Sequence, residues 1–240
     1  VEWMLAVVAE LTRVCRGLVL MNCAGVTRKH HYWPGCEGLA YEWHRRRLGT
    51  LWRPAYWHRV GIPGSGGKQW LRADVEYVLA FKKDATPLEW ADNTANGHPP
   101  KYAPGGAMSH RVGDGSQRKT MTRRAPNGSR QGDIIHSEGY TPPTLANPGT
   151  LIQGIKVGGG LMGSKLAHEN EAPFPERLAE WFIRSWCKPA GLVLDPFSGS
   201  GTTVKAAIKL GRRGIGCDLR FSQCELGRRR TLEVQRELPL

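Results

Sequence analysis

The fold is decided by the stretch Gly191-Leu-Val-Leu-Asp195-Pro-Phe-Ser-Gly-Ser-Gly-Thr-Thr203 near the end of the 240-residue chain. The apolar run before Asp195 predicts a buried strand, and Ser198 to Gly201 predict a turn. Thr202 to Leu210 predict a helix, and Arg213 to Cys217 predict a second strand. This order of elements is typical of an open α/β sheet, in which nucleotide-like ligands bind at the carboxyl ends of the strands.

The residue types in this unit suit a ligand that carries an anion, a cation and a ribose. Gly199 and Gly201 allow a tight turn, and free N–H groups of the first helical turn can receive a carboxylate. Asp195 at the strand end can hold an ammonium group, and Asp218, after the next strand, is placed to hydrogen-bond ribose hydroxyls. A methionine moiety offers both charges, with Thr202 as another partner for its carboxylate.

Other segments extend the α/β pattern. Helical spacing predicts a helix over Glu2 to Arg16, and the short apolar run Leu18 to Cys23 predicts a strand of a parallel sheet. Leu51 to Val60 and Val75 to Phe81 are expected to form two antiparallel strands. A further helix is expected to begin at Pro175 and to end near Lys188 and Pro189. Asp84 to Thr150 shows no periodicity and is interpreted as an insertion.

Three segments resemble the DNA N4-cytosine and N6-adenine methyltransferases. Asp195 to Thr203 looks like the cofactor motif of that family, and His168-Glu-Asn-Glu-Ala-Pro-Phe-Pro-Glu176 is similar to the segment that precedes it. Arg53-Pro-Ala-Tyr-Trp-His-Arg59 with Leu71-Arg-Ala-Asp-Val-Glu-Tyr-Val-Leu-Ala-Phe81 resembles the family's hairpin beyond the catalytic motif. The resemblance covers nearly the whole chain except residues 84 to 146.

The resemblance implies an α/β, Rossmann-like S-adenosylmethionine-dependent methyltransferase fold, circularly permuted, with an irregular insertion. Residues 1–83 would form the C-terminal part of the catalytic half, 84–150 a loop-rich target-recognition insertion, and 151–240 the half that binds S-adenosyl-L-methionine. The motif matches imply the following cofactor-binding residues: Phe174, Pro175, Asp195, Pro196, Phe197, Ser198, Gly199, Ser200, Gly201, Thr202, Thr203 and Asp218.

Some residues of this set also allow a purely structural role. Phe197 could be a core aromatic residue, and Asp218 could cap a helix. Pro173 and Phe174 could fix the start of the next helix or contact the cofactor directly. These alternatives stay open at the level of the sequence.

As an activity, the resemblance implies site-specific transfer of a methyl group from S-adenosylmethionine to the exocyclic amine of adenine (N6) or cytosine (N4) in DNA, as in restriction–modification. The family's catalytic motif, Asp or Ser followed by Pro-Pro and an aromatic residue, would precede the first helix and is expected upstream of Val1. Thr141-Pro-Pro-Thr144 and His98-Pro-Pro-Lys101 lack both the polar and the aromatic residue. The catalytic residues and the target base therefore cannot be assigned from these 240 residues.

The charge of the chain favours a polyanionic partner. There are 34 Lys and Arg against 21 Asp and Glu, which gives a net charge of +13. A basic protein binds nucleic acid favourably, because each phosphate that it neutralises releases counterions and adds affinity. The loop Gly61 to Lys68 lacks the residues of a phosphate-binding loop and is expected to lie against substrate. The expected partner is double-stranded DNA, contacted by Arg53, His58, Arg59, Lys68, Arg118, Lys119, Arg123 and Arg124.

Other readings remain. A basic surface can serve solubility alone, and the chain could be a non-catalytic DNA-binding module. An RNA or protein methyltransferase could share the same cofactor half, although the order of the motifs argues against it. Six cysteines form no CxxC pair, and His30, His31 and Cys36 lack a second ligand pair, so no metal is expected. No apolar stretch approaches the length of a membrane span and no signal peptide is visible, which points to the cytoplasm.

Overall fold

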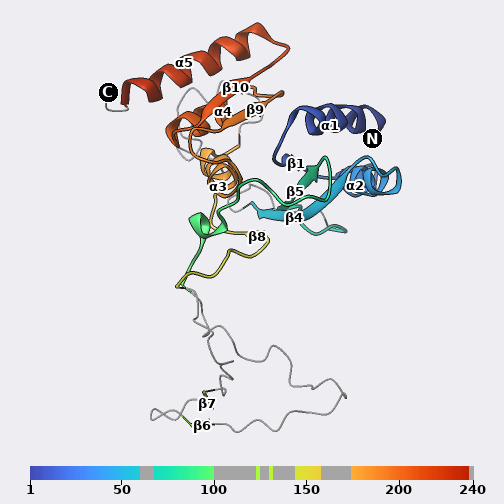
Figure 1. Cartoon of the computed structure of the whole chain (residues 1–240). Helices are drawn as coiled ribbons and strands as arrows, with labels where there is room; N and C mark the ends of the chain where they lie inside the picture. The colour runs from blue at the N-terminus through green and yellow to red at the C-terminus, as the bar shows by residue number, and fades with distance from the viewer. Residues whose placement is uncertain (60–67, 100–122, 125–129, 132–143, 158–173, 238–240) are drawn as a thin grey trace. The chain divides into compact units, whose positions relative to one another are not determined.

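The computed structural model describes residues 1–59, 68–99, 123–124, 130–131, 144–157 and 174–237. The chain divides into two compact units: the first joins Val1–Asn96 with Gly149–Leu240, and the second is Gly97–Pro148. The elements are labelled in Figure 1. Among the described residues, no helix has both the length and the apolar character that a membrane span requires.

The larger sheet of the first unit has four strands in the order β1-β5-β4-β8. β4 and β5 are antiparallel, which confirms the expected pair of strands. Their register shifts between Trp52 and Ala55, where Pro54 has no N–H to donate to the ladder. The bounds are β1 (Val19–Cys23), β4 (Thr50–His58), β5 (Val75–Lys82) and β8 (Leu151–Ile152).

The direction of β1 differs from the sequence prediction. The apolar run at Leu18 to Cys23 forms a strand, as expected, but it pairs antiparallel with β5, with Val19 opposite Phe81 and Cys23 opposite Tyr77. A continuous apolar run reports burial and carries no information on the direction of the neighbouring strand. That neighbour lies far along the chain, and the long-range pairing decided the outcome.

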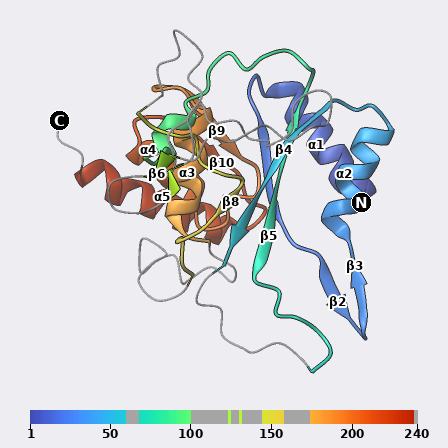
Figure 2. The same ribbon diagram turned by 90° about the horizontal axis from the view of Figure 1, so that it is seen from below.

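Two helices cover one face of this sheet (Figure 2). α1 (Glu2–Val14) confirms the first predicted helix, and α2 (Gly35–Arg45) follows β1 along the chain. Their buried side chains pack against the odd-numbered residues of β5, which alternate to that face. The cluster contains Leu5, Val8, Val19, Cys36, Leu39, Trp43, Leu79 and Phe81.

A third helix, α3 (Glu176–Trp186), covers the opposite face (Figure 2). Its Leu178 and Phe182 pack with Trp57 of β4 and Val78 of β5. Trp57 also donates from Nε1 to the backbone oxygen of Ile155 over 3.0 Å, which satisfies the polar atom of a buried indole. The sheet is therefore covered on both sides, as in α/β folds.

The order of strand, turn, helix and strand in the sequence analysis is confirmed. The prediction that the first strand is buried is wrong, because Leu192 and Leu194 are 50% and 43% exposed. β9 (Leu192–Asp195) and β10 (Arg213–Gly216) form a parallel pair in which Asp195 lies opposite Gly216. α4 (Thr202–Lys209) connects them and packs on α3 through a small cluster of buried residues, Ala179, Ile183, Ala206 and Ala207. α5 (Phe221–Glu237) follows β10 and packs on α4.

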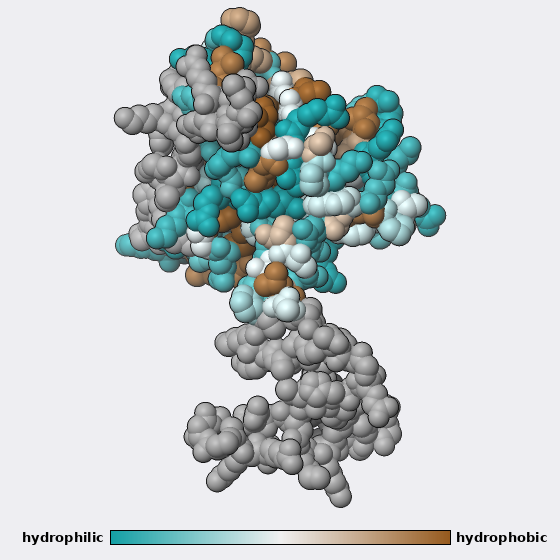
Figure 3. Space-filling model, turned by 60° about the vertical axis from the view of Figure 1, so that its left-hand side comes forward, coloured by the Kyte–Doolittle hydropathy of each residue, from teal (hydrophilic) through white to brown (hydrophobic). Residues whose placement is uncertain are grey.

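Smaller elements complete the first unit. β2 (Val26–Arg28) and β3 (His31–Trp33) form a separate hairpin. The short helix η1 (Asn93–Asn96) is fixed to α3, because the Asn96 Nδ2 group donates to the Trp181 backbone oxygen over 2.7 Å. On the face shown in Figure 3, hydrophobic residues occupy separate areas between hydrophilic ones. The sequence analysis predicted neither α2, nor α5, nor the β2–β3 hairpin.

In the second unit, two short strands pair antiparallel, β6 (Arg123–Arg124) with β7 (Arg130–Gln131). Near its two ends, His98 and Ala146 exchange two backbone hydrogen bonds of 3.1 and 2.9 Å. The chain therefore enters and leaves this unit at one place.

Candidate cofactor site

The glycine turn after β9 is built from backbone hydrogen bonds. Asp195 Oδ1 accepts from the Phe197 N–H over 3.0 Å, and the Gly201 N–H donates to the Ser198 oxygen over 2.7 Å. Gly199 and Gly201 have φ values of +47° and +76°, in the left-handed region that glycine adopts without steric cost. The turn therefore needs glycine at both positions and directs the start of α4 away from β9.

The carboxylate of Asp218 lies beside this turn. Its Oδ2 accepts from the Gly199 N–H over 3.0 Å, while the Ser198 N–H donates to the Cys217 oxygen over 2.8 Å. The two acidic residues thus lie at the carboxyl ends of neighbouring parallel strands: Asp195 is the last residue of β9, and Asp218 lies two residues after the end of β10. The structure brings together the two carboxylates and the glycine turn that the sequence placed in one site.

Asp218 also has the local role that the sequence left open. Its Oδ1 accepts from the Arg220 N–H over 2.9 Å, just before α5 begins. This hydrogen bond has the largest effect on the pKa of Asp218, which is lowered below its ordinary value. Loss of hydration opposes it, and the Gly199 N–H and the Arg220 side chain lower the pKa further. Asp218 is therefore a carboxylate at neutral pH, and each oxygen retains acceptor capacity for a ligand hydroxyl.

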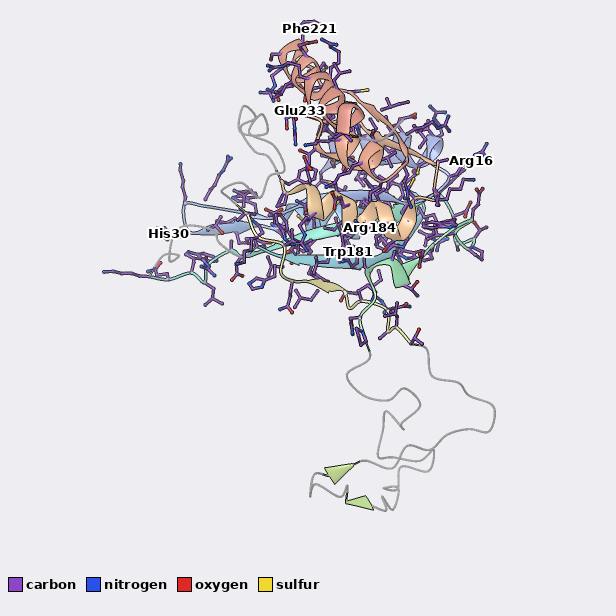
Figure 4. The ribbon with its side chains drawn as sticks, turned by 90° about the vertical axis from the view of Figure 1, so that its left-hand side faces the viewer. Arg16, His30, Trp181, Arg184, Phe221 and Glu233 are labelled. Carbon is purple, nitrogen blue, oxygen red and sulfur yellow. The ribbon has the colours of Figure 1, made fainter. Side chains whose placement is uncertain are left out.

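Apolar side chains lie exposed next to both carboxylates. Phe197 is 55% exposed and its ring contacts that of Trp3 of α1 at a centroid distance of 5.9 Å, so it is not a core residue. Leu219 is fully exposed, and Phe221 lies exposed at the outer end of α5 (Figure 4). Sequence analysis missed Leu219 and Phe221, although an apolar residue directly after a carboxylate at a strand end was a readable signal.

A buried charged cluster supports the turn from behind. Arg230 of α5 has no exposed surface, and its Nη1 donates to the Ser200 oxygen, the Ser200 hydroxyl and the Thr202 hydroxyl over 2.8, 2.6 and 3.0 Å. Its Nη2 donates to Glu176 of α3 over 3.0 Å, and Lys205 of α4 forms an ion pair with the same carboxylate over 2.9 Å. Arg230 thereby ties the turn to two helices.

Backbone contact between two glycines brings α5 close to the turn. A Cβ atom on Gly201 would lie 2.8 Å from the Cα of Gly227, a distance that real Cβ atoms do not show. Helix α5 can approach this closely because Gly201 has no side chain, whereas a Cβ on Gly227 would lie 3.4 Å from the Gly201 Cα, an ordinary contact. The hollow beside this contact is lined by Ser198, Gly201 and Arg228 among others, and neither Asp195 nor Asp218 borders it.

Several other residues of the predicted cofactor set have inward-facing positions. Ser200 and Thr202 are buried, and their hydroxyls face Arg230. Pro175 is buried at the start of α3, and Phe174 packs in two core clusters. Their packing is that of residues that fix the start of the helix, and direct cofactor contact stays a prediction. Pro196, Ser198 and Thr203 are partly exposed around the turn.

The predicted DNA-binding residues lie in both units. Arg53 is exposed beside the irregularity of β4, and Lys68 is exposed as well. His58 lies 3.7 Å from Asp74, and Arg59 is paired with Glu76, so both are engaged with acidic side chains. Arg123 and Arg124 belong to β6. Arg118, Lys119 and the segment His168 to Pro173 lie outside the described residues.

Known proteins resemble parts of this chain. The orphan methyltransferase M.BamHII of Bacillus amyloliquefaciens is 42% identical over 66 residues, which are 28% of this chain and 25% of that protein. The type II methyltransferase M1.MboII of Moraxella bovis is 38% identical over 94 residues, 39% of this chain and 30% of that protein. The matched region spans less than a third of the length of either relative.

Solved structures confirm the expected α/β, Rossmann-like methyltransferase fold. The PvuII DNA methyltransferase, which is cytosine-N4-specific, has a TM-score of 0.62 at 15% identity and covers 98% of this chain and 74% of its own. M1.HpyAVI in complex with SAM has a TM-score of 0.55 at 18% identity, covering 95% and 82%. A family model described as DNA methylase, for N6 and N4 methyltransferases, matches residues 1–229. With a match over nearly all of its 240 residues, this chain belongs to the DNA methylase family.

Proposed function

We propose that this chain binds S-adenosyl-L-methionine and supplies the cofactor half, with part of the DNA surface, of an enzyme that methylates the N6 amine of adenine or the N4 amine of cytosine in double-stranded DNA. The observation that supports it most is the hydrogen bond from the Gly199 N–H to Asp218. This bond unites the glycine turn and the second carboxylate in one site on one edge of the β9–β10 pair.

The residues present suit this cofactor. Asp218 would accept hydrogen bonds from the ribose hydroxyls, and Asp195 would bind the ammonium group. Backbone N–H groups at the start of α4 would receive the carboxylate, because the hydroxyl of Thr202 already faces Arg230. Phe197 and Leu219, exposed beside the carboxylates, offer apolar surface to the adenine ring.

The cofactor, when bound, supplies a methyl group on a sulfonium, which an amine nitrogen can displace in line. The chain's own contribution is to hold this group in a fixed orientation, which is where such reactions gain most of their rate. The target base would have to leave the stack to present its amine. Residues 1–83 would belong to the catalytic half, 84–150 to target recognition and 151–240 to cofactor binding.

Contacts to DNA are part of the same proposal. Arg53 and Lys68 are exposed and basic in the first unit, and they suit phosphate contacts. Arg118, Lys119, Arg123 and Arg124 would add backbone contacts from the second unit. His58 and Arg59 would need to exchange their acidic partners, Asp74 and Glu76, for phosphate.

The cofactor site is tested by calorimetry with S-adenosylmethionine. Asp218→Ala removes the acceptor for the ribose hydroxyls, and we expect affinity to fall at least about tenfold. Glu225→Ala, which removes an exposed carboxylate of α5 paired with Arg228, is the matched control and should bind as the wild type does. Unchanged binding by Asp218→Ala would remove this residue from the site.

A ribose analogue separates a lost ligand contact from a disturbed turn. Wild-type protein should bind the 2′,3′-dideoxy form of S-adenosylhomocysteine more weakly than S-adenosylhomocysteine itself. Asp218→Ala should bind the two alike, because the partner of the hydroxyls is gone. An equal preference in both proteins would show that Asp218 acts only on the turn.

The reaction is tested by transfer of a tritiated methyl group to unmethylated duplex DNA, with this chain and the complete natural gene product side by side. Methylation of duplex DNA by the complete product is expected. Cofactor binding without transfer to DNA would contradict the proposal and favour a non-catalytic DNA-binding module. Transfer to RNA in place of DNA would favour an RNA methyltransferase.

A further inference from the structure

The β2–β3 hairpin stands apart from the sheets of the first unit. Val26 pairs with Trp33, Thr27 with Tyr32 and Arg28 with His31, and all six residues are exposed. Within the described part of the chain, neither strand pairs with any other strand. His30 lies at the projecting tip of this hairpin (Figure 4). An isolated two-stranded ribbon buries little apolar area, so packing of the fold does not explain the basic residues of this hairpin.

The turn at the tip has an unfavourable choice of residues. Lys29 and His30 have φ values of +49° and +60°, the two consecutive positive values of a type I′ turn. Asn-Gly is the preferred pair there, and side chains with a Cβ cost about 1–2 kcal/mol per residue in this region. Lys29 and His30 thus occupy the turn at a conformational cost. Unfavourable backbone conformations of this kind are concentrated at functional sites.

The charges of the hairpin have one sign. Residues 26–33 contain Arg28, Lys29, His30 and His31 and no acidic residue. No ion pair joins Arg28 or Lys29 to an acidic group among the residues that the structure describes. Val26, Arg28, Lys29, His31 and Trp33 line one shallow hollow, in which the rings of His31 and Trp33 meet edge to face at 4.6 Å. Trp33 is 58% exposed.

The base of the hairpin is fixed. The Tyr32 hydroxyl donates to Glu37 of α2 over 2.9 Å, and the Tyr77 hydroxyl of β5 donates to the same oxygen over 3.0 Å. Loss of hydration and the bond to Glu37 raise the pKa of Tyr32 to about 12, so the hydroxyl stays a donor. A Cβ on Gly25 would lie 2.2 Å from the Tyr32 hydroxyl, so glycine makes this packing possible.

We propose that the β2–β3 hairpin is a DNA-contacting ribbon, in which Arg28 and Lys29 bind phosphates of duplex DNA and Trp33 packs against the sugar and phosphate backbone. The major groove of DNA admits a two-stranded ribbon of this kind, and cationic contacts to phosphate fix its position without reading sequence. The inference rests on the proposed function, because it requires DNA as the substrate. It adds a contact surface outside the cofactor site and the second unit.

The turn chemistry allows a test that keeps the hairpin folded. The variant Arg28→Gln/Lys29→Asn/His30→Gly removes two full charges and installs the Asn-Gly pair that a type I′ turn prefers. The control Arg16→Gln/Lys83→Asn removes two full charges from exposed positions outside the hairpin. Affinity for a labelled 20-base-pair duplex of arbitrary sequence is measured by fluorescence anisotropy over a series of salt concentrations.

The hairpin variant should bind the duplex at least several-fold more weakly at low salt, and its slope of log K against log salt should be smaller by about 0.9 for each lost phosphate contact. The control should keep the wild-type slope. If the wild type binds the duplex and the hairpin variant binds it with the same affinity and salt slope, the inference about the hairpin is wrong and the proposed function stands. If the wild type binds S-adenosylmethionine and not duplex DNA, or prefers single-stranded RNA of equal length, the proposed function fails as well.

Discussion

Arg230 has no exposed surface, and four oxygen atoms around it accept hydrogen bonds from its guanidinium group. Arg230→Met would leave the Ser200 and Thr202 hydroxyls and the Ser200 backbone oxygen without their donor, while Lys205 would remain on Glu176. We expect the free energy of unfolding to fall by about 3 kcal/mol, because removing one partner of a buried charged network is strongly destabilising. Urea unfolding measures the change.

The matched control for this variant is two positions earlier on the same helix. Arg228 is exposed and pairs with Glu225 along the helix surface. Arg228→Met should change the free energy of unfolding much less than Arg230→Met, because exposed ion pairs contribute little to stability. Equal effects of the two substitutions would show that the buried cluster does not stabilise the turn.

Gly201 and Gly211 have the same backbone conformation and different surroundings. Alanine substitutions at the two positions therefore distinguish the cost of backbone strain from the cost of a steric clash. Their φ values are +76° and +73°, but a Cβ on Gly211 would meet nothing within 4 Å. Gly211→Ala should therefore cost only the strain of the left-handed region, about 1–2 kcal/mol. Gly201→Ala adds the collision with Gly227 and should lower both thermal stability and cofactor affinity more, as measured by calorimetry. Equal losses would contradict the close approach of α5.

At the scale of elements, helices and strands could be predicted from the sequence wherever the residue pattern that defines them lies within one segment. The β9–α4–β10 unit was predicted from one apolar run, two glycines and the short segment Arg213 to Cys217, all within one stretch of the chain. Asp195 and Asp218 could be placed together, because parallel neighbouring strands end at the same edge. The β4–β5 pair followed from aromatic and branched residues on both sides of a turn-rich segment.

Elements whose identity depends on distant contacts were not predicted. The direction of β1 is set by β5, more than 50 residues later. Helix α5 contains many arginines and looks solvated along its whole length, although Arg230 lies in the interior. A buried arginine cannot be told from an exposed one until Glu176 and Ser200 are known to surround it. The residues behind the candidate site were missed for this reason.

At the scale of the whole molecule, the acid limit of stability depends on hydrogen-bonded carboxylates. Neighbouring arginine, lysine or threonine side chains, or backbone N–H groups, lower the pKa of Glu2, Glu42, Asp84, Asp92, Asp218 and Glu225, that of Glu42 to about 2. The unfolded chain binds protons at these groups more readily than the folded one. Their stabilisation is therefore complete above the ordinary carboxyl pKa of about 4 and is lost as pH falls through the lowered values.

The thermal midpoint, followed by circular dichroism, should be level from pH 7 to pH 5 and fall steadily below pH 4. Glu42→Gln should reduce the fall, since a carboxyl that protonates near pH 2 would be gone. A midpoint that stays constant down to pH 3 would show that these hydrogen bonds do not survive in solution.

The two backbone hydrogen bonds between His98 and Ala146 hold the start and the end of the intervening segment next to each other. Whatever lies between the two residues can lengthen, shorten or change composition without altering the spacing of the flanking chain, because each doubling of such a loop costs only about 0.6 kcal/mol in closure entropy. The segment between these two residues can therefore be replaced as one piece. If the segment recognises the target, as we propose, its exchange between relatives would change the preferred DNA sequence and leave the β9–α4–β10 unit unaltered.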